Sequence, residues 1–137
     1  MKVVLDTNVV VSGLLSPFGP PGEIIRMVAS GLLELCYDAR ILSEYQNVLT
    51  RQKFPFDQAH VEDLLKQIEA CGHITTGKPL AKRLSDPDDE PFLEVALGGK
   101  AQYLITGNLK HYPVKKQQGM QVVSPSEFLE IYRKSIS

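Results

Sequence analysis

Apolar and polar residues alternate along this chain in blocks of two kinds. Short apolar runs, of which Val3-Val4-Leu5 is the first, predict strands that are buried on both faces. Longer blocks repeat apolar residues every three or four positions and predict amphipathic helices. Strands are expected at residues 2–5, 32–37, 102–108 and 120–124, and helices at 8–15, 23–30, 39 to about 52, 57–70, 125–136 and from Pro87 onward.

Turn-forming residues separate these blocks. Residues 16–22 read Ser-Pro-Phe-Gly-Pro-Pro-Gly and predict a loop, and residues 73–80 are expected to be a short extended piece or a loop. Because strands and helices take turns throughout, the pattern predicts an α/β fold, a three-layer α/β/α sandwich around a central, mostly parallel sheet. A chain of 137 residues suits a single domain, expected to span residues 1–137.

Composition bears on the protein's surface and cellular compartment more than on its catalytic chemistry. Charged residues make up 23% of the chain and the formal net charge is -1, so no broad basic surface for nucleic acid is indicated. No segment approaches the ~20 apolar residues of a membrane span, and the first residues lack the order of a signal peptide. Two isolated cysteines, Cys36 and Cys71, predict reduced thiols in a cytoplasmic protein.

Asp6 directly follows the first predicted strand and is the first candidate for chemistry. In open α/β sheets, ligands collect outside the carboxyl ends of the strands. The simpler alternative is that Asp6, Thr7 or Asn8 only caps the following helix.

Glu44 lies beside the apolar stripe of the helix that starts at residue 39. At about 100° per residue, Glu44 falls ~40° outside the edge of that stripe. A side chain in this position can face the seam between helix and sheet. The alternative is a solvated glutamate. The stripe is formed by Ile41, Leu42, Tyr45, Val48 and Leu49.

Asp89 is centred on the apolar face of the helix expected after the N-cap Asp86, whereas Asp88, Glu90 and Glu94 are expected to point elsewhere. A carboxylate in that position is costly unless something compensates it. One alternative compensation is a capping box with Asp86 at the positive end of the helix.

Thr106 and Asn108 end the third strand and are expected at the same sheet edge as Asp6. Asn108 also suits a simple turn with Gly107. If Asp6, Glu44 and Asp89 gather there, their repulsion raises at least one pKa. A hard divalent cation, Mg²⁺ or Mn²⁺, relieves that repulsion and prefers carboxylate oxygens.

Three stretches of the chain resemble the motifs of PIN-domain ribonucleases. They are VVLDTNVVVSGLL near the N-terminus, DPDDEPFLEVAL, and YLITGNLKHYP. The resemblance covers essentially the whole chain. Within the family, the chain is similar in particular to VapC-like toxins of toxin–antitoxin pairs. It implies a compact α/β/α fold and a metal-dependent endoribonuclease that cleaves RNA phosphodiesters with a metal-activated water.

The resemblance also assigns roles to residues of the chain. Asp6, Glu44 and Asp89 match the acids that hold Mg²⁺ or Mn²⁺. The fourth position, often Asp in the family, is Asn108 here, which removes one negative charge and leaves open whether one or two metal ions bind. Asn108 is expected to orient a water. Two further polar residues, Asn8 and Thr106, match positions that order the site.

Basic residues near these motifs are expected to hold the RNA backbone, although ordinary surface charge is the alternative for each. The candidates are Lys110, Lys115, Lys116 and Arg51, with Lys53 beside it. Tyr112 is a candidate for stacking on a base. The three histidines lack metal-ligand spacing and are interpreted as structural or surface residues, namely His60, His73 and His111.

Partners follow only from the resemblance, which implies a cognate antitoxin protein and a homodimer.

Two other classes of protein with a strand-end Asp do not fit the sequence. A HAD-type phosphatase needs an acid two residues after Asp6, where this chain has Asn8, and the acids lack the order of a receiver domain. The remaining alternative is a catalytically weak PIN-fold module that binds RNA or protein, which Asn108 keeps open.

Overall fold

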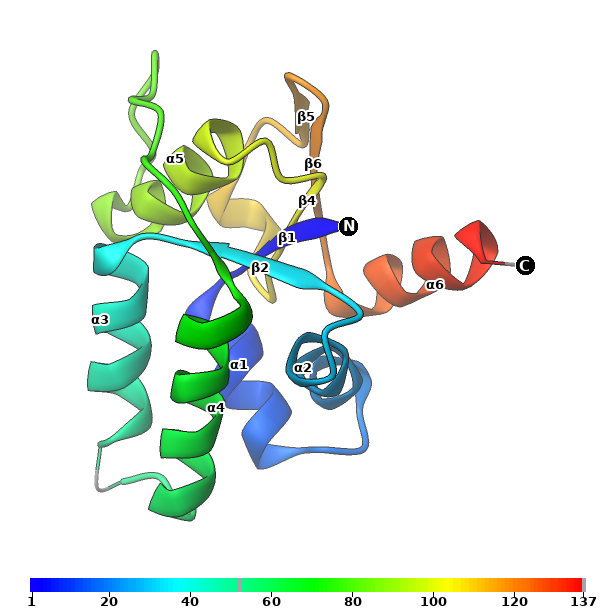
Figure 1. Ribbon diagram of the computed structural model, residues 1–137. Helices are drawn as coiled ribbons and strands as arrows, with labels where there is room; N and C mark the ends of the chain where they lie inside the picture. The colour runs from blue at the N-terminus through cyan, green and yellow to red at the C-terminus, as the bar shows by residue number, and fades with distance from the viewer. Residues whose placement is uncertain (52, 137) are drawn as a thin grey trace.

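A computed structural model describes residues 1–51 and 53–136 (Figure 1). In these residues the strands are β1 Lys2–Leu5, β2 Glu34–Tyr37, β3 His73–Ile74, β4 Tyr103–Ile105, β5 Lys116–Gln117 and β6 Met120–Val123. The α-helices are α1 Thr7–Leu15, α2 Pro20–Ala29, α3 Ala39–Leu49, α4 Gln58–Cys71, α5 Glu90–Gly98 and α6 Pro125–Ser135, with short 3₁₀ turns η1 Pro87–Asp89 and η2 Leu109–His111. None of these helices is long and apolar enough to cross a membrane.

The described strands form one six-stranded sheet in the order β3-β2-β1-β4-β6-β5, and β5 is its one antiparallel strand. Val3, Val4 and Leu5 of β1 have no exposed surface. Figure 1 shows why, because α1 to α4 lie on one side of β1 and β2 and α5 lies on the other. The predicted α/β/α arrangement with a mostly parallel central sheet is confirmed.

Register brings the carboxyl ends of the central strands to one edge. Leu5 pairs with Ile105 on β4, and Ile105 pairs with Val123 on β6. The same ladder continues one residue further, because the Asp6 amide donates to the Ile105 carbonyl at 3.0 Å and the Thr106 amide donates to the Val123 carbonyl at 3.0 Å. Asp6 and Thr106 therefore leave adjacent strands side by side, as their sequence positions predicted.

The element boundaries differ from expectation where proline, glycine or very short strands are involved. The predicted loop over residues 16–22 ends early, because α2 already starts at Pro20, and proline is favoured in a first helical turn. Of the two-residue strands, β3 lies in the segment that was expected to be extended or a loop, whereas β5 was not predicted. Positive φ at Gln118 and Gly119 makes the tight turn between β5 and β6. The helix expected to reach about residue 52 ends at Leu49, and residue 52 lies outside the described residues.

The helix predicted from Pro87 has two parts. Asp86 is an N-cap, as expected, and its side chain accepts from the Asp88 amide at 2.9 Å. It caps the 3₁₀ turn η1, however, and α5 starts only at Glu90. The tighter winding of η1 changes the direction in which the residues after it point.

Both cysteines are free thiols. Cys36 lies within β2, and burial raises the pKa of its thiol to about 11. Cys71 is exposed at the end of α4.

A buried hydrogen bond fixes α3 to the end of β1. The Tyr45 side chain is fully buried, and its hydroxyl donates to the Leu5 carbonyl at 2.5 Å. Leu5 immediately precedes Asp6, and Tyr45 immediately follows Glu44. This single bond therefore holds together the backbone segments that carry two of the candidate acids.

Tyr45→Phe is expected to lower the free energy of unfolding by about 1 kcal/mol, because the Leu5 carbonyl loses a buried donor. Urea unfolding followed by circular dichroism measures this loss. The matched control is Tyr132→Phe on α6, whose ring stacks on Phe128 and whose hydroxyl has no hydrogen bond within the described chain. Equal losses in the two variants would show that the Tyr45 bond does not stabilise this edge.

Candidate metal centre

Asp6 is the most enclosed of the candidate acids, with 5% of its surface exposed. Its Oδ2 atom accepts two hydrogen bonds, from Thr106 Oγ1 at 2.9 Å and from the Tyr112 hydroxyl at 3.2 Å. Burial raises the pKa of this carboxyl most, and repulsion from Asp89 raises it further, while the Thr106 and Tyr112 donors oppose the rise. Asp6 therefore carries a charge that the fold holds in one orientation.

Glu44 lies half-buried on α3 and faces the same edge. Its Oε2 atom accepts a hydrogen bond from Thr7 Oγ1, and Thr7 directly follows Asp6 in the chain. Burial is the main cause of its raised pKa, with repulsion from Asp6 and Asp88 adding to it. Thr7 and Arg51 act in the opposite direction. Glu44, which lies just outside the apolar stripe of α3, therefore faces the seam between this helix and the sheet.

Asp89 is also buried, with 8% of its surface exposed, at the junction of η1 and α5. The capping-box alternative does not describe it, because its Oδ2 atom lies 2.9 Å from His111 Nδ1. Burial raises the pKa of Asp89 most; His111 lowers it, and Asp86 and Glu44 raise it. These mutual effects show that Asp6, Glu44 and Asp89 act on one another electrostatically.

Two residues of the segment after β4 take different roles from those predicted. His111 was interpreted as structural or surface, yet it contacts the Asp89 carboxylate. Tyr112 was a candidate for base stacking, but it is 1% exposed and its hydroxyl is bonded to Asp6. The available signal was their place three to four residues after Asn108, at the carboxyl end of a strand.

Glu90 was expected to point away from the core, and that prediction is wrong. It is 6% exposed, and Arg83 holds it with two nitrogens at distances of 2.9 to 3.2 Å. The Leu84 amide also donates to it at 2.9 Å, and these partners lower its pKa. Leu93 and Leu97 follow Glu90 by three and seven positions. This helical spacing places Glu90 on the same face of α5 as those leucines.

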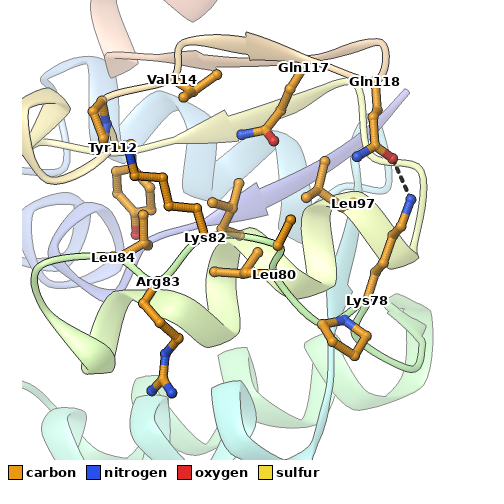
Figure 2. Close-up of a pocket in the computed structure, with 14 residues that line it drawn as sticks. Lys78, Leu80, Lys82, Arg83, Leu84, Leu97, Tyr112, Val114, Gln117 and Gln118 are labelled. Carbon is orange, nitrogen blue, oxygen red and sulfur yellow. Dashed lines mark hydrogen bonds between the residues drawn. The ribbon is translucent and has the colours of Figure 1, made fainter.

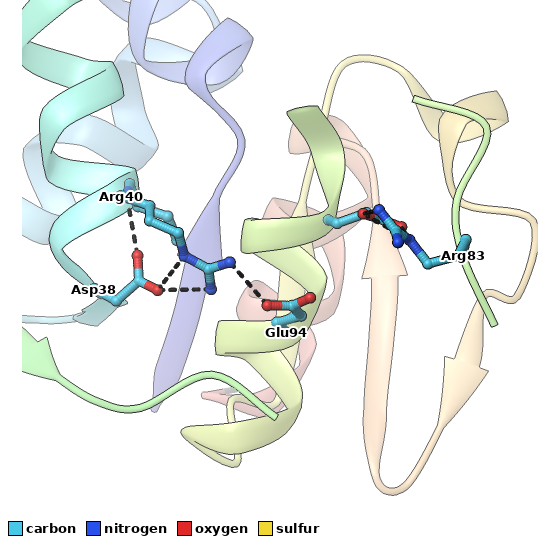
Figure 3. A network of polar contacts seen from close by, with 6 residues as sticks. Asp38, Arg40, Arg83 and Glu94 are labelled. Carbon is cyan, nitrogen blue, oxygen red and sulfur yellow. Dashed lines mark hydrogen bonds and ion pairs between the residues drawn. The ribbon is translucent and has the colours of Figure 1, made fainter. Parts of the chain in front are cut away.

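A charged contact joins α3, which carries Glu44, to α5, which begins directly after Asp89 (Figure 3). Arg40 on α3 lies 2.8 Å from Asp38 and 2.9 Å from Glu94 on α5. Half of the Arg40 side chain is exposed, so this contact contributes little to stability by itself. It nevertheless links a side chain of α3 to one of α5.

The other polar candidates link the strand ends. Asn8 Oδ1 accepts from the Gly107 amide at 2.9 Å, which joins the segments that leave β1 and β4. Thr106 Oγ1 accepts from the Asn108 amide at 3.0 Å while it donates to Asp6. The Asn108 side chain is exposed and has no hydrogen bond within the described chain.

The basic candidates are spread unevenly. Arg51 acts electrostatically on Glu44, and Lys110 lies exposed beside His111 in η2. Lys115 donates to the carbonyls of Leu109 and Tyr112. The acids lie at the edge of the sheet where β6 ends, at Val123. Lys116 lies on β5 and pairs with Gln121, which is nearer the start of β6. The strand register therefore does not bring Lys116 to the acids.

The donor atoms suit a divalent cation. One ligand atom from each of Asp86, Asp89 and His111 lies within 4.8 Å of the others. Asp6, Glu44 and Asp89 do not reach that spacing, although their charges repel one another. Carboxylates are hard ligands that Mg²⁺ and Mn²⁺ accept, and an imidazole nitrogen favours Mn²⁺.

The fold and this acidic edge are those of a nuclease-type domain, and the comparison with known families agrees. The chain belongs to the PIN domain family, whose model matches residues 2–110. PIN domains are generally metal-dependent nucleases.

An uncharacterized protein of Methanocaldococcus jannaschii is 26% identical over 148 residues, and the alignment covers 100% of this chain and 95% of that protein. No solved structure gave a significant match.

Thr106→Val is expected to lower the free energy of unfolding by about 1–2 kcal/mol at neutral pH, because buried Asp6 loses a donor to its charged form. Losing that donor raises the folded pKa of Asp6 further. The penalty is therefore full above the folded pKa and shrinks as pH falls through it, when Asp6 becomes neutral.

Urea unfolding at neutral and acidic pH measures this dependence on metal-free protein. Thr106→Ser is the control, since it keeps the hydroxyl and is expected to recover most of the loss. A penalty for Thr106→Val that does not change with pH would contradict a role in holding the Asp6 charge.

Proposed function

We propose that this protein is a metal-dependent endoribonuclease whose reacting centre is the acidic edge. The observation that carries the proposal is the convergence of three buried or half-buried carboxylates from three separate elements. Asp6, Glu44 and Asp89 raise one another's pKa there, and a fold gains nothing in stability from such repulsion. A site for a divalent cation gives that arrangement a purpose.

In this proposal Asp6, Glu44 and Asp89 hold Mg²⁺ or Mn²⁺, and Asp86 and His111 lie close enough to Asp89 to share in the binding. The cation, when bound, supplies activation of a water and neutralisation of phosphate charge. Thr106 and Tyr112 hold the Asp6 carboxylate in its orientation. His111 does the same for Asp89, and Thr7 for Glu44.

Asn108 completes the proposed site from the exposed side. Its amide is positioned by the backbone bond to Thr106 and can orient a water or a phosphate oxygen. It cannot add the charge that an aspartate would. The proposal therefore holds for one bound cation or for two.

The basic residues divide into two groups in this proposal. Arg51, Lys110 and Lys115 lie near the acids and are proposed to hold the RNA backbone. Lys116 is left out because its strand register places it away from them. The cytoplasmic toxin role, the cognate antitoxin and the homodimer remain proposals that rest on the resemblance to VapC-like toxins.

The second candidate function is a PIN-fold module that binds RNA or protein with weak or no catalysis. Asn108 favours it, because an amide replaces a fourth acid at the edge. The two functions differ in whether RNA is cut when metal is supplied.

Single-stranded RNA incubated with the protein and Mn²⁺ is expected to be cleaved, and EDTA is expected to prevent cleavage. Asp6→Asn and Asp89→Asn are each expected to reduce the rate by roughly a hundredfold, because each removes a charged ligand. Glu62→Gln on the exposed side of α4 is the charge-matched control and should cut at the wild-type rate. Intact RNA that is retained on a gel in every tube would favour the binding module instead.

Mn²⁺ is also expected to stabilise the protein without RNA. At a concentration a hundred times its dissociation constant, a bound cation raises the free energy of unfolding by about 2.7 kcal/mol, which a thermal melt detects. Asp89→Asn should lose most of the rise in melting temperature. An equal rise in the variant and the wild type would contradict cation binding at Asp89.

A further inference from the structure

A groove that the sequence did not predict lies beside the acidic edge (Figure 2). One wall is the segment of residues 78–84, the other is the segment of residues 112–118, and α5 forms the floor. Its volume is about 260 Å³. We refer to it as the 78–84 groove.

Both ends of its outer wall are fixed to α5. The Lys78 amide donates to the Glu94 carbonyl at 2.9 Å, and the Leu84 amide donates to the Glu90 carboxylate at 2.9 Å. A third contact spans the groove, since Lys78 Nζ donates to Gln118 Oε1 at 2.6 Å (Figure 2). The groove is therefore formed before any ligand binds, which lowers the entropic cost of binding.

The inner surface is mainly apolar. Leu80, Leu84 and Leu97 line it and are only partly buried, while Leu93 lies deeper on the α5 side. Val114 borders it from the opposite wall with 51% of its surface exposed. These side chains leave apolar surface that a flat ring can cover.

The charges of the groove are all positive. Lys78, Lys82 and Arg83 line it, and its lining includes no carboxylate, although the whole chain has a net charge of -1. Arg83 is paired with Glu90, and Lys78 is bonded to Gln118. Lys82 has no hydrogen bond or ion pair within residues 1–51 and 53–136, and Figure 2 shows its side chain extending across the groove toward Tyr112.

The groove and the acidic edge share a wall. Tyr112 lines the groove, while its hydroxyl donates to Asp6 Oδ2 at 3.2 Å. On the other side Arg83 holds Glu90, the residue that follows Asp89. The groove is thus connected to Asp6 through Tyr112 and to the residue after Asp89 through Arg83.

We infer that the 78–84 groove binds one nucleotide of a single-stranded RNA, next to the phosphodiester that lies at the carboxylates. The base packs on the leucines and Val114, and the Lys82 ammonium pairs with a backbone phosphate. The inference rests on the proposed RNA substrate. The volume of about 260 Å³ is just under the ~300–1,000 Å³ typical of small-molecule sites, so the groove has the scale of a single small ligand such as one nucleotide.

Fluorescence anisotropy with a labelled single-stranded RNA of about ten nucleotides tests this inference, in EDTA so that no cleavage occurs. Lys82→Ala is expected to weaken binding and to lower the salt slope, log affinity against log salt, by about 0.7, because one phosphate contact is lost. Leu80→Gln is expected to weaken binding roughly fivefold or more with the salt slope unchanged, because only the apolar wall changes.

Lys66→Ala is the matched control, since Lys66 is an exposed lysine on α4. It should bind RNA as the wild type does. In cleavage assays with Mn²⁺, Lys82→Ala and Leu80→Gln should raise KM and leave kcat unchanged.

Two results would overturn the groove assignment. One is RNA binding by Lys82→Ala and Leu80→Gln that matches the control, which would leave a protein partner as the remaining occupant. The other is a wild type that does not bind RNA in EDTA. Failure of the proposed function is seen separately, as a wild type that binds RNA through Lys82 and Leu80 but does not cut it with Mn²⁺.

Discussion

Repulsion among three carboxylates at the end of β1 is the constraint that the rest of this structure accommodates. Asp6, Glu44 and Asp89 are withdrawn from solvent to different degrees, and burial together with mutual repulsion raises each pKa. Each of them has a polar partner. Thr106 and Tyr112 bond Asp6, Thr7 bonds Glu44, and His111 contacts Asp89. These partners come from α1 and from the segment after β4, so the edge is also where the main layers meet.

The surrounding framework is arranged so that the layers cannot relax away from this edge. Tyr45 fixes α3 to β1 through a fully buried bond, whereas Arg40 joins α3 to α5 from a partly exposed position. The buried bond contributes more free energy, because exposed ion pairs are screened by water. Such a rigid support is what a preorganised cation site requires, since its ligands must stay close although they repel.

Arg83 connects this edge to the groove beside it. By holding Glu90 it fixes the start of α5, directly after Asp89, and also the end of the outer wall of the groove at Leu84. Tyr112 makes a similar connection on the opposite wall, through Asp6. The positive groove and the negative edge are therefore parts of one surface. Our proposal is that a cation at the carboxylates lets this surface bind a phosphate chain, and PIN domains are generally metal-dependent nucleases.

Local rules in the sequence were enough for strands β1, β2, β4 and β6 and for part of the edge. Asp6 and Thr106 were placed together because parallel strands deliver their carboxyl ends to one side, and Asp89 was picked out by the apolar residues that follow it. Tertiary structure alone decided the partners, because His111 and Tyr112 meet Asp89 and Asp6 across 22 and 106 residues of chain. It also decided Glu90, whose burial depends on the turn of η1 and on Arg83. Helical periodicity describes one element at a time, whereas a charge is buried only where another element supplies its partner.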